Sequence, residues 1–282
     1  MSSNEPRVWV NGRLTRIDEP AVAALDHGVT VGDGAFETAK VDQGQVFAAT
    51  RHARRLDRTL AGLGLPAADH GYLAEGVAAV LGAGPQIEFG RLRYSVTGGA
   101  GPLGSDRDDS PLTYIVTAGE QPRPPASASV AVVPWVRNER SAVAGLKTTS
   151  YAENVVALAY AKERGAIEAV FANTRGELCE CTGSNIFVVG DGVILTPPLD
   201  SGCLAGITRA VTIEWCREEG MEVREEAMPI EVLGDADEVF ITSSTKDVLA
   251  IHAVDDRAVR PGPVTARAAE VFAKLSADRV DP

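Results

Sequence analysis

A proline-rich segment near the middle of the sequence limits how the chain can fold. Residues 119–128, GEQPRPPASA, carry three prolines in ten positions and show no apolar periodicity. Proline fixes φ and lacks a backbone N–H, so this segment suits a linker better than a helix or a central strand. We therefore predict two domains, residues 1–120 and residues 129–282, joined by a linker at residues 121–128.

Both predicted domains combine short strands with helices. The pairs Asn11-Gly12 and Gln43-Gly44 each stand between strand-like runs and are typical of β-hairpin turns. A helix capped by Thr50 follows the second hairpin. The other elements expected from periodicity are helices at 70–83, 151–165 and 207–220, and strands at 91–99, 112–119, 129–136, 168–174, 185–196 and 238–244. This mixture predicts an α+β fold.

Composition argues against several classes of function. The 282 residues are 45% hydrophobic and 23% charged, which is ordinary for a globular protein. A net charge of −12 argues against nucleic-acid and anionic-membrane partners, because both require a basic face. The four cysteines lack the spacing of a zinc site or a disulfide framework, and no apolar run resembles a signal peptide or a membrane span. We expect a cytoplasmic protein with a small-molecule partner and no metal.

One lysine stands out by its position. Lys147 lies just before a helix-like run, and Thr149 or Ser150 can cap that helix. Burial and the positive end of a helix both disfavour a charged ammonium, which favours a neutral, nucleophilic amine. The alternative is an ordinary strand-end lysine that reaches solvent, as most lysines do. Other motifs decide between these two interpretations.

Three further motifs bear on that choice. Glu180 leads into a core strand, where a carboxylate needs a partner such as a protonated ring nitrogen, unless it turns outward at the strand end. The turn at residues 206–208 opens a helix, whose free N–H groups can bind phosphate. Residues 243–245 form a hydroxyl cluster at the end of another strand. An aldehyde for Lys147, a ring nitrogen for Glu180 and a phosphate for the turn together describe pyridoxal phosphate.

The order of the motifs resembles the class IV aminotransferases, the pyridoxal-phosphate enzymes of fold type IV. The resemblance runs from about Val8 to Val254 and includes GDGAFE, HARRL, LKTTSY, ECTGSNIF, GITR and TSST in that order. It implies a small N-terminal α/β domain and a larger C-terminal pseudo-barrel domain. Relatives of this kind include branched-chain aminotransferases, D-amino-acid transaminases, (R)-amine transaminases and aminodeoxychorismate lyases.

The resemblance implies a role for each motif around the cofactor pyridoxal 5′-phosphate. Lys147 would bond the cofactor covalently and move a proton between substrate Cα and cofactor C4′, and Glu180 would keep the ring nitrogen protonated. Tyr151 is implied near the cofactor ring. The residues implied at the cofactor phosphate are Arg55, Gly206, Ile207, Thr208, Ser243 and Ser244.

The substrate side departs from the family pattern. The residues implied in the substrate pocket are Phe36, Thr182, Gly183 and Thr245. D-Amino-acid transaminases of the family hold the substrate carboxylate with an Arg-x-His pair, but this chain has Gly98 at the arginine position and lacks the histidine. Arg93 or Arg107 would replace that pair. We favour Arg93, because it lies on a predicted strand where branched-chain enzymes place a substrate-side arginine.

Three functions fit these residues. The first is a transaminase, of D-amino-acid type, that moves an amino group between an amino acid and a 2-oxo acid. The second is a lyase that releases pyruvate and 4-aminobenzoate from aminodeoxychorismate, since such lyases resemble the Gly-rich loop at residues 98–104. The third is an acidic binding protein without activity, against which the intact Lys147 and Glu180 argue. The resemblance also implies a homodimer.

Overall fold

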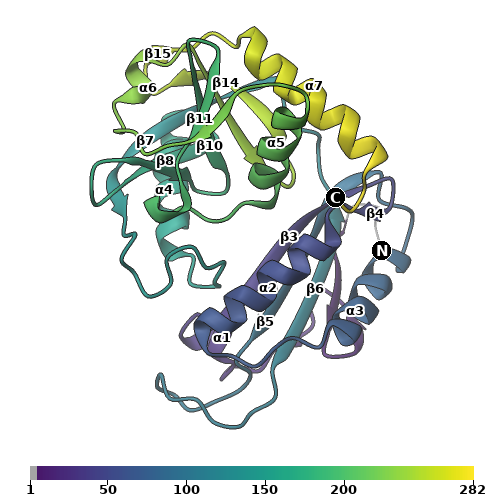
Figure 1. Ribbon diagram of the computed structural model, residues 1–282. Coiled ribbons are helices and arrows are strands. Elements are labelled where there is room, and N and C mark those ends of the chain that lie inside the picture. The colour runs from purple at the N-terminus through teal and green to yellow at the C-terminus, as the bar shows by residue number, and fades with distance from the viewer. Residues whose placement is uncertain (1–4) are drawn as a thin grey trace. The chain divides into compact units, whose positions relative to one another are not determined.

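The computed structural model describes residues 5–282, which separate into two compact units (Figure 1). The first unit consists of the chain up to Arg123, the segment Leu146–Tyr151, and Asp281. The second consists of Pro124–Gly145, Ala152–Val280 and Pro282. The sequence placed the lysine segment with residues 129–282, but the contacts of Leu146–Tyr151 assign it to the first unit.

The first unit is a six-stranded antiparallel sheet with two helices packed on one face. The strand order is β2-β1-β6-β5-β3-β4. Leucines from α2 and α3 share one core cluster with sheet residues such as Val96 and Val116, so both helices cover the same face. The elements are β1 (Arg7–Val10), β2 (Arg13–Thr15), α1 (His27–Thr30), β3 (Gly34–Asp42), β4 (Gln45–Val46), α2 (Ala49–Leu63), α3 (His70–Gly82), β5 (Phe89–Thr97) and β6 (Thr113–Glu120).

The two predicted hairpins are confirmed. Asn11 and Gly12 join β1 to β2 with φ values of 44° and 89°, and Gln43 and Gly44 join β3 to β4 with φ values of 49° and 75°. Both pairs therefore adopt the left-handed conformation that two-residue hairpin turns require. This geometry fixes the register of the first sheet at both ends of its strand order.

The expected cap of the following helix is wrong. Helix α2 begins at Ala49, and its N-cap Ala48 makes no side-chain hydrogen bond. Thr50 lies inside the first turn, where its N–H donates to Asp281 Oδ1 at 2.9 Å and its hydroxyl donates to Asp281 Oδ2 at 2.5 Å. A residue near the end of the chain thus satisfies an N–H that has no partner within the helix.

The second unit is a mixed nine-stranded sheet that curls into a half-barrel. Its order is β12-β11-β10-β13-β14-β7-β8-β9, with β15 paired to β14. Residues 182–184 turn the chain from β9 into β10, and the Cys181 N–H donates to Ser184 O at 2.9 Å. The elements are β7 (Ser127–Arg137), α4 (Ala152–Glu163), β8 (Glu168–Asn173), β9 (Leu178–Cys181), β10 (Asn185–Gly190), β11 (Val193–Thr196), the 3-10 helix η1 (Leu199–Ser201), α5 (Ile207–Glu218), β12 (Val223–Glu225), α6 (Val232–Asp235), β13 (Glu238–Ser243), β14 (Asp247–Val254), β15 (Arg257–Ala258) and α7 (Pro263–Asp278).

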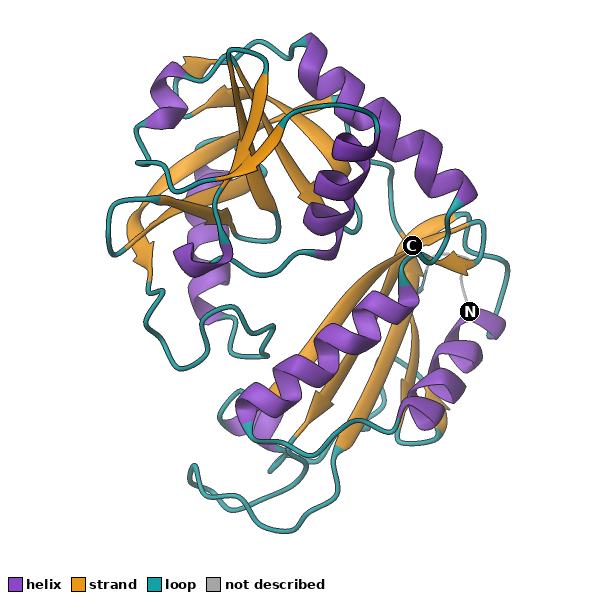
Figure 2. Cartoon of the chain, in the orientation of Figure 1, coloured by secondary structure: helices purple, strands orange, loops and turns teal. Residues whose placement is uncertain are grey.

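Two long helices share an apolar core with this curled sheet, whose strands appear orange in Figure 2. Helices α5 and α7 contact each other and strands β13 and β14. Phe187 of β10 and Phe240 of β13 stack with ring centroids 4.6 Å apart, and Trp215 of α5 lies 5.3 Å from Phe272 of α7. The packed helices fix the start of α5, which carries the predicted phosphate turn.

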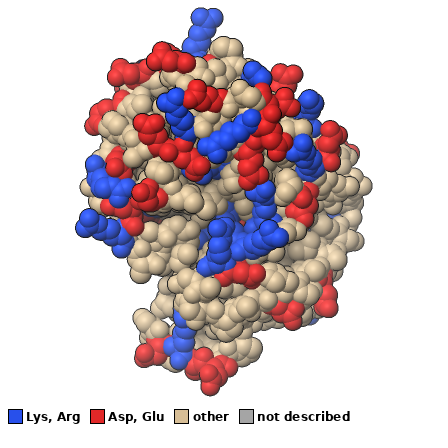
Figure 3. Space-filling model, viewed as in Figure 1, with Lys and Arg blue, Asp and Glu red and all other residues tan. Residues whose placement is uncertain are grey.

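The surface carries charges of both signs. On the face shown in Figure 3, acidic and basic side chains are interspersed. Several charged residues of the chain form ion pairs, among them Arg279 and Glu218 at 2.9 Å. Within residues 5–282, each helix is either too short or too polar to cross a membrane.

Candidate active site

The lysine segment is fixed to two elements of the first unit by its backbone. The Phe36 N–H donates to Lys147 O at 3.0 Å, and the Thr149 N–H donates to Gly34 O at 2.8 Å, so the segment pairs with β3. The Lys147 N–H donates to the hydroxyl of Thr59 in α2 at 3.3 Å. The position of Lys147 is therefore set by a strand and a helix together.

The hydroxyls of Thr149 and Ser150 do not form the predicted helix cap. Thr149 Oγ1 and Ser150 Oγ donate to Gly32 O at 2.8 and 3.0 Å, respectively. Both bonds tie the lysine segment to the turn before β3 rather than to helix α4. The two hydroxyls thus add to the attachment of Lys147 within the first unit.

The structure brings three predicted site residues together around the ring of a fourth, Phe36. Lys147 Nζ lies 4.2 Å from the centroid of the Phe36 ring and 5.9 Å from that of Tyr151. The two rings meet edge to face with centroids 5.2 Å apart. The Arg93 guanidinium carbon lies 3.7 Å from the Phe36 centroid. The structure thus places an amine, two aromatic rings and a guanidinium in one cluster.

A buried triad of charged residues fixes Arg55. Arg55 Nε and Nη2 donate to the two oxygens of Glu37 at 2.8 and 2.7 Å, and His52 Nδ1 lies 2.7 Å from Glu37 Oε2. All three residues are at least 95% buried. Burial opposes ionisation of Glu37, but Arg55 and His52 outweigh it and lower the pKa of Glu37 to about 2. Burial also lowers the pKa of His52.

The two candidate carboxylate-binding arginines have different surroundings. Arg107 donates from Nε and Nη2 to Asp33 at 2.7 and 2.5 Å and from Nη1 to Gly64 O at 3.3 Å. Its guanidinium is thus directed to groups of its own unit. Arg93 lies on β5, opposite Thr38 of β3, and burial lowers the pKa of its guanidinium. Of the two, Arg93 is the more buried cation, and it lies against the same Phe36 ring as Lys147.

In the second unit, Glu180 has partners that the sequence did not reveal. The Leu204 N–H donates to Glu180 Oε2 at 2.9 Å, and Arg137 Nε lies 3.3 Å from Glu180 Oε1. The guanidinium carbon of Arg137 lies 4.2 Å from the centroid of the Phe171 ring, and Arg137 Nη1 donates to Asn154 Oδ1 at 2.8 Å. The carboxylate therefore does not simply turn outward. Its two oxygens face the Leu204 N–H and the Arg137 guanidinium.

The start of helix α5 is shaped for close approach. Its N-cap is Gly206, which provides no side-chain capping bond. A Cβ on Gly206 would lie 1.8 Å from Asn185 Oδ1, so a larger residue there would displace the Asn185 side chain. Asn185 Nδ2 in turn donates to Leu204 O at 2.9 Å and holds the preceding loop. The first N–H groups of a helix lack intrahelical partners, which makes this end at Ile207 and Thr208 suitable for an anion.

The hydroxyl cluster at residues 243–245 includes a buried group without a hydrogen-bond partner in the described part of the chain, whereas the turn at residues 182–183 has its N–H groups bonded. Ser243 Oγ is buried and has no hydrogen-bond partner within residues 5–282, whereas Ser244 is half-buried and Thr245 buried in the turn after it. The Thr182 N–H donates to Ala169 O at 3.0 Å, and the Gly183 N–H donates to a carboxylate of β8 at 2.9 Å. The N–H groups of Thr182 and Gly183 are thus already used.

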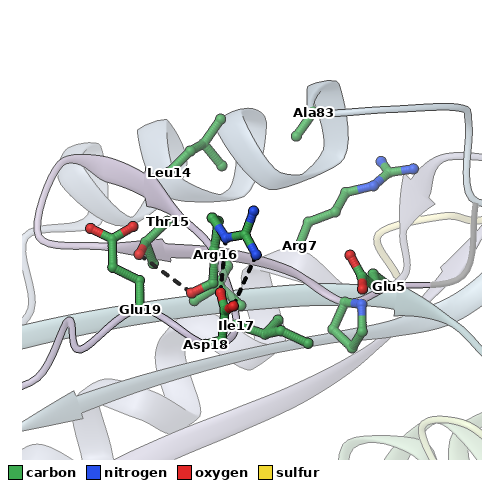
Figure 4. Close-up of a pocket in the computed structure, with 11 residues that line it drawn as sticks. Glu5, Arg7, Leu14, Thr15, Arg16, Ile17, Asp18, Glu19 and Ala83 are labelled. Carbon is green, nitrogen blue, oxygen red and sulfur yellow. Dashed lines mark hydrogen bonds and ion pairs between the residues drawn. The ribbon is translucent and has the colours of Figure 1, made fainter. Parts of the chain in front are cut away.

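One cavity of about 590 Å³ lies elsewhere in the first unit (Figure 4). It is lined by β1, β2, the turn after β2 and Ala83. Arg7 and Arg16 border it, but Arg16 pairs with Asp18 at 2.9 Å and Arg7 donates to the carbonyl of Leu81 at 2.9 Å. Within the described residues, its lining includes none of the predicted site residues.

Comparison with known proteins identifies the family. Residues 34–254 match the family described as amino-transferase class IV. The chain therefore belongs to the class IV aminotransferases, which depend on pyridoxal phosphate, as the motif order predicted.

Individual relatives cover nearly the whole chain. A D-alanine aminotransferase of Bacillus licheniformis is 30% identical over 271 residues, which cover 92% of this chain and 93% of that protein. The branched-chain aminotransferase of Thermoproteus uzoniensis, solved with norvaline, is 28% identical, with a TM-score of 0.89 and coverage of 95% and 94%. The branched-chain amino acid aminotransferase of Escherichia coli is 26% identical, with a TM-score of 0.87 and coverage of 97% and 94%. The predicted α+β fold of type IV is confirmed.

Proposed function

We propose that this protein is a pyridoxal-phosphate-dependent transaminase that moves an amino group between a D-amino acid and a 2-oxo acid. The observation that carries the proposal is the amine of Lys147, 4.2 Å from the Phe36 ring on a backbone fixed by β3 and α2. The D-amino-acid preference is supported by the similarity to D-alanine aminotransferases. The cofactor is supported by relatives solved with pyridoxal phosphate or its amine form.

The residues present fit this cofactor. An uncapped twelve-residue helix at Gly206 and the unpartnered hydroxyl of Ser243 offer donors to a phosphate. Glu180, which lies against Arg137 and accepts from the Leu204 N–H, would hold a protonated ring nitrogen. When bound, the cofactor supplies an aldehyde for the amino group and a ring that withdraws electrons from substrate Cα.

Lys147 would then act twice. Its amine would bind the cofactor covalently and, once released by the substrate amine, would accept the proton from substrate Cα. The ring of Phe36 and the half-buried setting limit the access of water to Nζ. Tyr151, whose ring packs against Phe36, would border the cofactor ring.

The substrate carboxylate is assigned to Arg93. A carboxylate entering this pocket needs a cation, because unpaired burial of charge is costly, and the N–H groups of Thr182 and Gly183 already have acceptors. Arg107 is directed to Asp33. Arg93→Ala is expected to raise KM for amino acids by about ten- to a hundredfold while sparing amines that lack a carboxylate. Arg107→Ala should have the smaller effect.

Steady-state kinetics with an amino acid and a carboxylate-free amine measures this ranking. A larger rise in KM for Arg107→Ala than for Arg93→Ala would assign the carboxylate to the loop arginine instead. Equal sensitivity of both substrates to Arg93→Ala would mean that the residue only supports Phe36, on which it stacks.

Arg55 is assigned to the cofactor phosphate. Glu37 already occupies the Nε and Nη2 edge of the guanidinium, so a bidentate phosphate contact through that edge is ruled out while the pair is intact. We expect Arg55→Lys to weaken cofactor binding by about tenfold, the lower end for one charge-assisted hydrogen bond. Equilibrium dialysis measures the loss, with Arg54→Lys on the exposed side of the same helix as control. Unchanged affinity in both variants would place the phosphate elsewhere.

The homodimer is assigned to an apolar patch of the second unit. Trp135 and Val136 of β7 are 43% and 46% exposed, and Val155 and Val156 of α4 are 64% and 54% exposed. The two elements meet where the rings of Trp135 and Tyr160 of α4 pack edge to face, with centroids 5.6 Å apart. Exposed apolar groups of this kind mark interaction surfaces.

Light scattering at micromolar concentration should give twice the 29.6 kDa chain mass. The double variant Val155→Glu, Val156→Glu should give the mass of a single chain. A single-chain mass for the unaltered protein would contradict the assignment.

The reaction itself is tested with paired donors. Cofactor-loaded protein is incubated with 2-oxoglutarate and either D-alanine or L-leucine, and the amino acid formed is quantified by chromatography. We expect turnover with D-alanine. Turnover with L-leucine alone would overturn the D-amino-acid preference but keep the transaminase, whereas release of 4-aminobenzoate from aminodeoxychorismate without transamination would favour the lyase.

A further inference from the structure

A buried carboxylate outside the groups assigned above has four hydrogen-bond donors. Glu168 begins β8 and is 3% exposed. Its Oε1 accepts from Lys246 Nζ at 2.7 Å and from Ser184 Oγ at 2.8 Å. Its Oε2 accepts from the Gly183 N–H at 2.9 Å and from the Thr182 hydroxyl. A carboxylate buried this deeply needs such partners, because burial of an unpaired charge is costly.

These donors come from two turns that are distant in the sequence. Residues 182–184 join β9 to β10, whereas Lys246 belongs to residues 244–246, which join β13 to β14. Strands β10 and β13 pair antiparallel, with Asn185 opposite Thr242, so the start of β10 and the end of β13 lie side by side at one end of these strands. Lys246 Nζ also lies 3.4 Å from Ser184 Oγ. The carboxylate of Glu168 therefore connects the two turns directly.

The connection depends on charge as well as on hydrogen bonds. Burial opposes ionisation of Glu168, but Lys246 and the hydrogen bonds outweigh it and hold the pKa of this carboxyl below its usual range. The Lys246 side chain is 24% exposed, so its ammonium keeps some contact with water while Glu168 does not. Removing either partner of such a pair leaves an uncompensated charge, which would loosen the turn that the other partner holds.

We propose that the Glu168–Lys246 ion pair sets the spacing of the two turns and thereby the affinity for the amino-acid substrate. This inference rests on the proposed function and on the roles that the family resemblance implies for the two turns, with Thr182, Gly183 and Thr245 at the substrate and Ser244 at the cofactor phosphate. Thr182 gives its hydroxyl and Gly183 its N–H to the same carboxylate oxygen, so a displaced carboxylate displaces both. Glu168 and Lys246 are positioning residues, because they act through the turns.

Two single variants of the cofactor-loaded enzyme test the pair. Glu168→Gln keeps the shape but removes the charge, and Lys246→Met removes the ammonium while three donors remain. Each is expected to raise KM for the amino acid by about tenfold and to change kcat less than about threefold. Lys246→Arg, which keeps a cation at this position, should have a KM near the parent value, unlike Lys246→Met. The double variant should be no worse than the more affected single one, because the two residues share one interaction.

A matched control separates positioning from stability. Glu238 is another buried carboxylate of the same sheet, 5% exposed, but it accepts from the N–H groups of Val264 and Thr265 and caps α7. Glu238→Gln should lower the unfolding temperature without raising KM. If Glu168→Gln and Lys246→Met also lose only thermal stability, the pair is a structural anchor and the proposal is wrong.

Hydrogen exchange provides a measurement that does not depend on activity. Peptides that cover residues 182–184 and 244–246 should exchange faster in Glu168→Gln and Lys246→Met, with or without cofactor, and not in Glu238→Gln. Unchanged exchange would overturn the proposal, and faster exchange with an unchanged KM would overturn its link to the substrate. Lack of transamination by the unaltered protein would instead overturn the proposed function. If Glu168→Gln does not fold, Lys246→Met decides the outcome.

Discussion

Replacing Lys147 with alanine is expected to prevent covalent binding of the cofactor and to slow transamination by roughly a thousandfold or more. A positioned general base alone contributes about 10²- to 10⁴-fold, and this variant loses the covalent bond as well. The fold should persist, because the segment is held by backbone bonds to β3 and α2 that alanine keeps. Initial rates with D-alanine and 2-oxoglutarate measure the effect, and circular dichroism checks the fold.

Lys162→Ala is the matched control for that variant. Lys162 is exposed in the last turn of α4 and should be replaceable without loss of rate. Equal loss in both variants would point to a general effect of lost charge. Transamination by Lys147→Ala at the parent rate would show that another group performs the chemistry.

The second large effect is expected at Glu37. Glu37→Gln should lower the free energy of unfolding by about 3–5 kcal/mol, because it leaves the buried Arg55 without its counter-charge. Asp57→Asn is the control, since the Asp57–His70 pair has similar chemistry but both side chains are more than 40% exposed. It should cost less than about 1 kcal/mol. Urea denaturation compares them, and similar losses would contradict the importance assigned to burial.

The same triad predicts an acid-sensitive fold. The pKa of Glu37 is about 2 in the folded protein and 4.5 in the reference state, so its contribution is complete above about pH 4.5 and is lost as pH falls toward 2. The pKa of His52 is lowered from 6.5, so the unfolded chain takes up a proton first and stability falls below that pH. Both effects have the same sign. Unfolding midpoints measured between pH 7 and pH 3 should fall faster for the parent than for Glu37→Gln.

Local patterns predicted most of the elements and several site residues. The hairpins at Asn11-Gly12 and Gln43-Gly44 depend only on adjacent residues, so the sequence revealed them. Phe36, Lys147 and Tyr151 stood in two motifs that the sequence revealed separately, and the pairing of the lysine segment with β3 brings them into one cluster. The order of those motifs was enough to predict the family and fold type IV.

Partners that come from distant segments were not predictable in this way. Glu37 and His52 stood in the quoted motifs GDGAFE and HARRL, yet neither motif shows that they meet around Arg55. Arg137 ends a strand forty-three residues before Glu180, and no local pattern links the two. Long-range ion pairs depend on the tertiary fold, so a single sequence gives their members but not their pairing.

Helix boundaries failed for the same reason. The cap of α2 comes from Asp281, and that of α7 comes from Glu238, far from each helix in sequence. Neither signal lies in the window in which capping residues are sought. The sequence therefore placed a cap at Thr50 and left α7 unpredicted.

The central claim is that Lys147 carries the cofactor, and peptide mapping tests it most directly. The chain has only five lysines, Lys40, Lys147, Lys162, Lys246 and Lys274. Protein loaded with pyridoxal phosphate is reduced with borohydride, digested and analysed by mass spectrometry, so that the modified lysine is identified by its peptide. We predict one modified peptide, containing Lys147. Specific modification of Lys246 or of any other lysine, or no stable adduct at all, would contradict the proposed site.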